Sequence, residues 1–382
     1  MASAPVYGHE ATRKVLAAAV RGGTLAQSIL LHGPAGVGKQ RMGLWLAQQL
    51  VCESPADALA CGRCQSCRMV LRLEHPDVHW FFPLPRPEAA SPEKLREKLE
   101  EARGAELAAR RADAFHVPAY DRAPAYFMGT VQNLQRHASV RPAMGNRKVF
   151  VVGDAEAMVP QESSPEAANA FLKLLEEPPA DTTLVLTSSN PGALLPTIRS
   201  RVLPVRLLPL QAPVVAEFLE QEKGLARGDA ERAAAISGGA IGRALRLLPG
   251  AGGASALQRQ RDAGRALLQA ATSSSSADRL AAANAVAPAG ARGEFTGTLD
   301  ALSLWLRDLM AVAAGARDTL AYTDDTAFLD GIARRGPVRA ESVASALIRV
   351  QEARELAAGN VNPQLIVAEL LRGIRGDLLA AA

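Results

Sequence analysis

The stretch SILLHGPAGVGKQ, residues 28–40, decides the fold of this chain. It opens with a short apolar run, continues with the pattern GxxxxGK, and is followed by an apolar-periodic segment from Met42 to Cys52. A strand, a glycine-rich loop and a helix in this order are typical of a phosphate-binding loop, because backbone N–H groups and the helix N-terminus then face an anion. The sequence therefore predicts an α/β domain built around a parallel sheet.

The candidate phosphate ligands of this loop are Gly33, Gly36, Gly38 and Lys39. The glycines let the backbone wrap a phosphate, and the lysine neutralises its charge. A working loop has Ser or Thr after the lysine, whose hydroxyl binds magnesium, but this chain has Gln40. We therefore expect a nucleotide site in which magnesium is poorly placed.

Three further apolar runs predict the other strands of the sheet. They are KVFVVGD, which ends at Asp154, TTLVLTSSN (182–190), and VLPVRLL, which begins at Val202. Continuous apolar runs that alternate with helical segments are typical of a parallel sheet covered on both faces. Asp154, at the end of its strand, is the candidate for the acidic residue that orients a metal ion.

All four cysteines of the chain lie in one short segment, as Cys52, Cys61, Cys64 and Cys67. Two residues between successive cysteines let their sulfurs converge, and four thiolates complete the shell of a tetrahedral zinc ion. No ligand position remains for water, so the predicted zinc site is structural. The alternative is four incidental cysteines.

The chain is long enough for two or three domains. We predict an α/β domain over residues 1–207, a small helical lid over 208–249 and an all-helical domain over 250–382, with the linker AGGASA at 251–256. The zinc module occupies 52–67.

From His75 to about Thr130 the pattern is irregular, and we mark 83–128 as an insertion. Ser91, followed by proline and glutamate, is typical of a helix cap there. The insertion is either a solvated helix or a surface for a partner.

Composition excludes several classes of protein. Hydrophobic residues make up 48% and charged residues 21% of the 382, a globular composition. The net charge of +4 and the aromatic content of 4% do not argue for a nucleic-acid surface. There is no apolar run of membrane-spanning length and no signal-like start, so we expect a cytoplasmic protein with no membrane contact.

Several longer blocks resemble one known family over nearly the whole chain. The chain is similar to the delta-prime subunits of the bacterial DNA polymerase III clamp loader, which are AAA+ proteins related to the gamma/tau ATPases. The blocks are GHEATRKVL (8–16), VGDAEAM (152–158), EAANAFLKLLEEPP (166–179), NPGALLPTIRSR (190–201) and NVNPQLIVAELL (360–371).

The resemblance implies an AAA+ domain, a lid and a collar domain that holds a ring of subunits together. It also implies roles for particular residues. Arg201, in a Ser-Arg motif whose usual cysteine is Val202, would reach the ATP site of the neighbouring gamma/tau subunit as an arginine finger, with Arg199 as the alternative. Ser188 or Ser189 would face a terminal phosphate, and Arg243 would be a second sensor.

AAA+ ATPases have a water-activating glutamate directly after the strand-end aspartate, where this chain has Ala155, with Glu156 one place later. This departure and Gln40 both affect hydrolysis. We therefore expect a protein in which the binding of ATP and magnesium is in doubt and the hydrolysis of ATP is impaired. It would work with gamma/tau and delta subunits to load a sliding clamp on primed DNA. The alternatives are an active gamma/tau-like ATPase, with Gln40 and Glu156 in altered roles, and a zinc-containing nucleic-acid binder.

Overall fold

The computed structural model describes most of the chain in two compact units, residues 1–245 and 246–382. The described residues are 6–56, 59–118, 120, 122, 124–158, 166–248, 256–286, 292–322, 325–335, 338–358 and 361–379. The predicted boundary at 249/250 and nearly all of the predicted linker 251–256 lie outside them.

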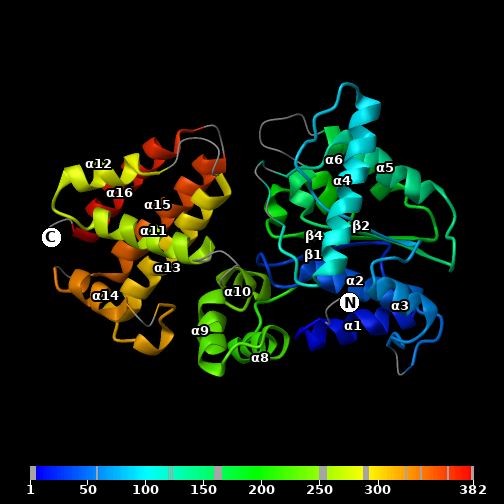
Figure 1. Ribbon diagram of the computed structural model, residues 1–382, viewed down its shortest axis with the longest axis horizontal. Coiled ribbons are helices and arrows are strands. Elements are labelled where there is room, and N and C mark those ends of the chain that lie inside the picture. The colour runs from blue at the N-terminus through cyan, green and yellow to red at the C-terminus, as the bar shows by residue number, and fades with distance from the viewer. Residues whose placement is uncertain are drawn as a thin grey trace. The chain divides into compact units, whose positions relative to one another are not determined.

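The first unit is built on a five-stranded parallel sheet (Figure 1). Its spatial order is β2-β3-β4-β1-β5, so the strand before the glycine-rich loop lies inside the sheet. The predicted strands are confirmed as β1, β3, β4 and β5. The bounds are β1 (Ser28–His32), β2 (Val78–Phe81), β3 (Lys148–Val152), β4 (Thr182–Ser188) and β5 (Leu203–Arg206).

Helices cover both faces of the sheet because alternate residues of the inner strands point to opposite sides. Ile29 and Leu31 of β1 pack with Met42 and Leu46 of α2 and with Leu16 of α1. On the other face, the intervening strand residues pack against α5 and α6. The helices of this layer system are α1 (Glu10–Arg21), α2 (Lys39–Val51), α5 (Met128–Ser139), α6 (Glu166–Glu176) and the short α7 (Pro196–Arg199).

The edge strand β2 was missed by the sequence analysis, which expected irregular structure after His75. Its four residues, VHWF, are too few for a clear apolar run, and pairing with β3 decides their conformation. The helix α4 (Pro92–Ala112) follows, and Ser91 caps it by accepting the N–H of Lys94, so the predicted cap is confirmed.

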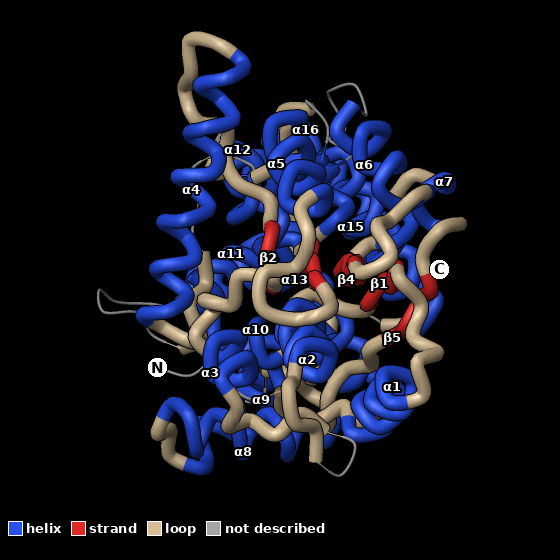
Figure 2. Tube along the Cα trace, turned by 90° about the vertical axis from the view of Figure 1, so that its right-hand side faces the viewer, coloured by secondary structure: helices blue, strands red, loops and turns tan. Residues whose placement is uncertain are grey.

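Figure 2 shows α4 running beside β2 at this edge of the sheet. Arg103 of α4 donates to the Trp80 carbonyl (3.3 Å) and lies over the Phe81 ring (4.6 Å). Arg110 lies over the rings of Trp80 (4.3 Å) and Phe82 (4.1 Å). The insertion therefore covers an edge of the sheet that would otherwise be open to solvent. This packing role goes beyond that of a solvated helix, which was one of the two alternatives for the insertion.

The segment predicted as a lid contains α8 (Ala212–Lys223), α9 (Arg227–Ser237) and α10 (Ile241–Leu247). The division between the two units falls after Leu245, so most of this segment belongs to the first unit. Its separation from residues 1–207 as a domain of its own stays a prediction.

All described elements of the second unit are helices, and its assignment as a separate domain over 250–382 stays a prediction. Its core contains the Trp305 and Tyr322 rings, 4.4 Å apart between centroids, and the buried carboxylate of Asp308, which accepts backbone N–H bonds from Ala321 and Tyr322. Its elements are α11 (Ala256–Ala271), α12 (Ser276–Asn284), α13 (Arg292–Ala313), η3 (Arg317–Thr319), α14 (Thr326–Ala333), α15 (Ala340–Ala358) and α16 (Pro363–Leu379). Among the described helices of both units, none is long and apolar enough to cross a membrane.

Candidate functional site

The glycine-rich loop connects β1 to α2 as the sequence predicted. Gly33 and Gly36 have φ values of 153° and 81°, and Gly38, with φ 99°, is the N-cap of α2. A Cβ on Gly33 would lie 2.2 Å from the Leu207 carbonyl oxygen, so only glycine fits there. The loop therefore has the backbone path that its sequence requires.

Lys39 is the first residue of α2, and its ammonium lies inside the loop. It donates to the carbonyl oxygens of Gly33 (2.9 Å) and Pro34 (2.8 Å) and to the Ser189 hydroxyl (2.8 Å). The residue is 5% exposed, and burial lowers the pKa of the amine against the opposing pull of Asp154 and Glu156. All three donors of the ammonium thus have protein acceptors in this structure.

Gln40 connects the loop to the strand-end aspartate. Its Nε2 donates to Asp154 Oδ2 at 2.9 Å, and its Oε1 accepts the indole N–H of Trp80 at 3.0 Å. A Cβ on Gly153 would lie 2.6–2.7 Å from the Gln40 amide atoms, so the missing side chain of Gly153 makes room for the amide. Magnesium requires oxygen ligands, and here a nitrogen faces Asp154 while the oxygen faces Trp80. The residues present do not fit a magnesium ion between the loop and Asp154.

Asp154 follows β3 in a left-handed conformation, with φ 48°. Its N–H donates to the Thr187 hydroxyl at 3.0 Å. Burial raises the pKa of its carboxyl group, and the charge of Glu156 adds to this, while Lys39 and the Gln40 amide act in the opposite direction. Ala155, the next residue, is fully buried and has no side-chain group for acid–base chemistry.

Glu156 points to the loop after β4. Its Oε1 accepts the backbone N–H groups of Ser189 (2.8 Å) and Asn190 (3.3 Å). Ser188 is fully buried, and its hydroxyl accepts the Asn190 N–H at 3.1 Å. Of the two candidate serines, the structure therefore brings Ser189 to Lys39, and places Ser188 at the buried end of the strand.

The backbone of Arg243 lies next to the glycine-rich loop. The preceding residue, Gly242, donates its N–H to the Gly36 carbonyl at 2.9 Å. A Cβ on Gly36 would lie 2.9 Å from the Arg243 nitrogen, and a Cβ on Gly242 would lie 2.9 Å from the Gly36 Cα. Two glycines thus allow the start of α10 to pack directly on the loop.

Arg201 lies in an exposed turn between two buried anchors. Ile198 and Val202 are 0% and 7% exposed, and both belong to the core cluster that contains Leu174 and Leu175 of α6. The valine that replaces the usual cysteine of the motif therefore has a packing role, and the side chain before it remains on the surface.

The Arg201 guanidinium lies against its own domain. Its Nη1 donates to the Thr197 carbonyl (2.9 Å) and the Ser200 hydroxyl (3.2 Å), and its Nη2 forms an ion pair with Glu176 Oε1 at 2.9 Å. The alternative candidate, Arg199, is also exposed. Within the part of the chain that the structure describes, its guanidinium has no comparable set of partners.

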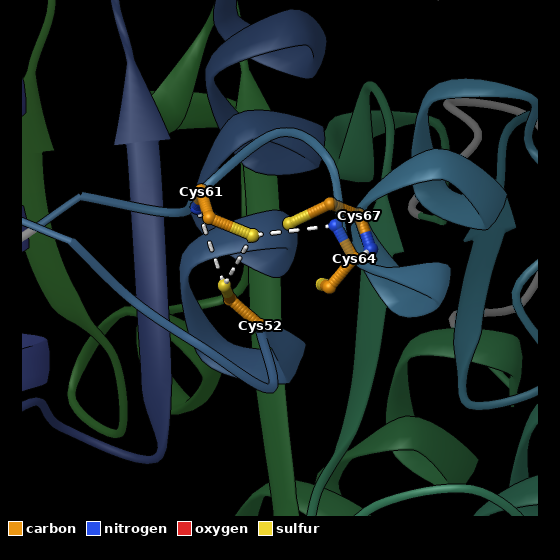
Figure 3. Close-up of side chains that lie close together, drawn as sticks. All are labelled: Cys52, Cys61, Cys64 and Cys67. Atoms are coloured by element: carbon orange, nitrogen blue, oxygen red, sulfur yellow. Dashed lines mark hydrogen bonds between the residues drawn. The ribbon is translucent and has the colours of Figure 1, made fainter.

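The four cysteine sulfurs converge at the end of α2 and the start of α3 (Gln65–Leu71) (Figure 3). All four Sγ atoms lie within 4.8 Å of one another. Zinc–sulfur bonds of about 2.3 Å in a tetrahedron place sulfurs about 3.8 Å apart, so the cluster matches the size of a four-thiolate zinc site.

Backbone N–H groups stabilise thiolates in this cluster. Cys61 Sγ accepts the N–H of Cys64 at 3.3 Å, and Cys64 Sγ accepts that of Cys67 at 3.4 Å. The N–H groups of Arg63 and Cys64 lower the pKa of the Cys61 thiol to about 6. Burial raises the pKa of Cys52 and Cys67, so these thiols require a cation to ionise at neutral pH. The donor set fits zinc.

Sequence reasoning missed three side chains of the site. Trp80 could not be assigned because its strand was not predicted. His9, whose Nε2 lies 2.9 Å from the Val37 carbonyl oxygen, belongs to the N-terminal block but had no individual signal. Glu176 belongs to the block 166–179, and only its contact with Arg201 distinguishes it from Glu177.

Comparisons of the chain with known proteins find a family model and several related subunits. A family model described as DNA polymerase III, delta subunit, matches residues 8–211. The delta' subunit of Pseudomonas aeruginosa is 35% identical over 176 residues, which are 46% of this chain and 41% of that protein. The Escherichia coli delta' subunit is 27% identical over 235 residues, 62% of this chain and 58% of that protein.

Related subunits match as well. The gamma/tau subunit of Mycobacterium bovis is 27% identical over 223 residues, 57% of this chain and 31% of that protein. A solved gamma-subunit-related protein of Thermotoga maritima has a TM-score of 0.42 at 16% identity, over 94% of this chain and 98% of that one. The match to the delta' relatives spans about half of their length. The family model covers more than half of this chain, and the chain therefore belongs to the DNA polymerase III delta-subunit family, as a subunit of the delta' type.

Proposed function

We propose that the protein is a clamp-loader subunit of DNA polymerase III that does not hydrolyse ATP itself. It would sit beside a gamma/tau ATPase in a ring that also contains a delta subunit, and present Arg201 to the neighbour's ATP. The ring would place a sliding clamp on primed DNA. Family membership supports the assembly, and the geometry around Gln40 and Arg201 supports the division of labour within it.

The observation that carries the proposal is the hydrogen bond from Gln40 to Asp154. Phosphoryl transfer in P-loop proteins uses a loop hydroxyl and a strand-end aspartate to hold magnesium. Here the loop residue and the aspartate bind each other at 2.9 Å. Ala155 adds no base beside them, and Glu156 is hydrogen-bonded to the backbone of residues 189 and 190. The hydrogen bonds of Gln40, Asp154 and Glu156 to other groups of the chain support a subunit that does not hydrolyse ATP itself.

Arg201 supports the second half of the proposal. A guanidinium placed at a neighbour's terminal phosphate stabilises the negative charge that develops as the phosphoryl group is transferred to water. The buried anchors Ile198 and Val202 fix the turn on the surface, and Arg201 is 35% exposed at its side chain. It is therefore accessible to a neighbouring subunit.

The zinc module would have a structural role. Four thiolates close the coordination shell, so the ion would supply folding energy and no catalytic water. Cys52 ends α2 and Cys64 is the N-cap of α3. The bound ion would thus join the helix that follows the phosphate-binding loop to the next helix.

Steady-state ATP hydrolysis tests the proposal at two levels. The purified chain alone should show no turnover above the level of its Lys39→Ala variant. A loader reconstituted from gamma/tau, delta and this chain should lose turnover when the chain carries Arg201→Ala, with Arg199→Ala as the matched control. A finger contributes about 10³-fold or more at the site it serves, so that site's share of the total should disappear.

Two results would favour other functions, and a third would remove one part of the proposed function. Turnover by the isolated chain that Lys39→Ala abolishes would make it an active gamma/tau-like ATPase. Salt-dependent binding of the isolated chain to DNA would favour a nucleic-acid binder. Unchanged turnover of a loader that carries Arg201→Ala, with assembly intact by size-exclusion chromatography, would remove the role of the arginine.

A further inference from the structure

Glu176 forms an ion pair with Arg201, and the proposed role of Arg201 as an arginine finger does not by itself account for this contact. It is the last residue of α6, it is 47% exposed at its side chain, and its Oε1 lies 2.9 Å from Arg201 Nη2. The adjacent Glu177 is also exposed and has no ion pair with Arg201 among the described contacts. Of these two neighbouring carboxylates, the one that pairs with Arg201 is that of Glu176.

The three contacts of Arg201 engage both terminal nitrogens of its guanidinium. Thr197 and Ser200 accept from Nη1, and Glu176 pairs with Nη2. A guanidinium has five N–H donors in a rigid plane. Three contacts fix the direction of that plane and leave N–H groups for a second anion. A braced side chain loses less conformational freedom when it meets its target than a free arginine does.

The bracing elements are themselves fixed to the core. Leu174 and Leu175, just before Glu176, are buried in the same cluster as Ile198 and Val202 on either side of the finger turn. The packing of α6 on α7 therefore sets the backbone positions from which the Glu176 and Arg201 side chains extend. A solvent-exposed ion pair of this kind raises the population of the paired arginine conformer, relative to the unpaired one, by a factor of about 1.5 to 5.

We propose that Glu176 is the positioning residue of Arg201: it orients the guanidinium toward the neighbouring subunit's ATP. This inference rests on the proposed function of Arg201. It assigns to Glu176 an effect on the rate of the chemical step in another chain, exerted only through the arginine. Glu176 does not touch the nucleotide.

The test is a double-mutant cycle in the reconstituted loader. The variants of this chain are Glu176→Gln, Arg201→Ala and the two combined, with Glu177→Gln as the matched control. The Arg201-dependent turnover is the wild-type rate minus the rate with Arg201→Ala. Glu176→Gln should lower this part of kcat by about two- to fivefold and leave KM for ATP unchanged, because the contact matters in the transition state. In the Arg201→Ala background it should have no effect.

Each outcome decides the question. A Glu176→Gln loader with wild-type kcat overturns the inference while the finger itself stands. An equal loss in the presence and absence of Arg201 also overturns it, since the glutamate would then act on folding or assembly. Wild-type turnover with Arg201→Ala removes the proposed function and the positioning role together. Size-exclusion chromatography of each reconstituted loader confirms that all variants assemble.

Discussion

The side-chain amide of Gln40 donates to Asp154 Oδ2 at 2.9 Å while it accepts the Trp80 indole N–H at 3.0 Å. Both functional atoms of one amide are therefore used in a short chain of hydrogen bonds between α2, β3 and β2. Asp154 is half-buried, and burial raises the pKa of its carboxyl group. The hydrogen bond from the amide thus stabilises the charged form of this carboxyl group.

The substitution Gln40→Leu should destabilise the protein. It keeps the approximate volume of the side chain but leaves Asp154 Oδ2 and the Trp80 N–H without this partner. Unsatisfied groups of this kind cost about 1–3 kcal/mol in the free energy of unfolding. Urea unfolding followed by circular dichroism measures the change. Gln132→Leu, at an exposed position of α5, is the control and should have little effect. Equal stability of both variants would contradict a structural role for the Gln40 amide.

The sequence was sufficient for the sheet interior because the pattern is strong there. The runs that became β1, β3 and β4 are buried on both faces, and short continuous runs of this kind are typical of buried parallel strands. β2 is different: it is a short edge strand whose Trp80 and Phe81 are covered by arginines of α4. Such cover depends on long-range packing, which no local pattern contains.

The sequence predicted which residues form the candidate site, but it did not predict which of them contact one another. The identities of Gln40 and Ala155 indicated weak hydrolysis, because each lacks a group that the chemistry requires. That the Gln40 amide bonds to Asp154 depends on Gly153, whose missing Cβ leaves the space. The partner of Arg201 likewise depends on the packing of α6 against α7, which brings Glu176 into range. The four cysteines were the clearest case, since their spacing alone predicted the cluster.

The purified chain should contain one zinc ion, and its removal should unfold the module 52–67 first. A bound ion would compensate the burial of Cys52 and Cys67, which raises the pKa values of their thiols. Metal content by mass spectrometry tests the stoichiometry. Hydrogen exchange with and without a chelator tests the location: protection should fall in residues 52–67 while β1 and β4 remain protected.

Cys64→Ser should reproduce the effect of the chelator, because it removes one thiolate while the serine hydroxyl can still cap α3. Gln65→Ala is the control at the neighbouring exposed site and should retain the ion. A full complement of zinc in Cys64→Ser would show that this sulfur is not a ligand.

Acid should destabilise the protein through His79. Its ring stacks on that of Phe150 (4.9 Å between centroids) and lies at a tilt against that of His137 (4.7 Å), and its Nε2 is buried without a partner among the described residues. Burial lowers the pKa of His79 to about 3, with His137, Arg103 and Lys148 adding to the shift and Asp77 opposing it. A folded-state pKa below the unfolded value of about 6.5 means that the neutral ring favours folding. This contribution is complete above pH 6.5 and is lost as the pH falls toward 3, at about 1.4 kcal/mol per unit.

The variant His79→Phe separates this effect from the protonation of carboxylates. The ring stack remains, but no proton can bind at this position. The difference in unfolding free energy between the variant and the wild type should therefore grow in favour of the variant as the pH falls from 6.5 to 4. A difference that is constant with pH would exclude His79 as a source of the acid sensitivity.

Leu99→Ala should release the insertion from the sheet edge. Leu99 is 2% exposed, and a Cβ on Gly129 of α5 would lie only 3.3 Å from it, so α4 and α5 are in close contact here. Removing the buried side chain leaves a cavity that costs about 2–5 kcal/mol. Because α4 covers β2 mainly through Arg103 and Arg110, its release should expose the segment 83–118 to limited proteolysis before the rest of the first unit. Glu101→Ala, on the exposed side of α4, should remain resistant. Equal cleavage of both variants would mean that Leu99 does not hold the helix in place, and that the arginine contacts with Trp80 and Phe81 suffice for docking.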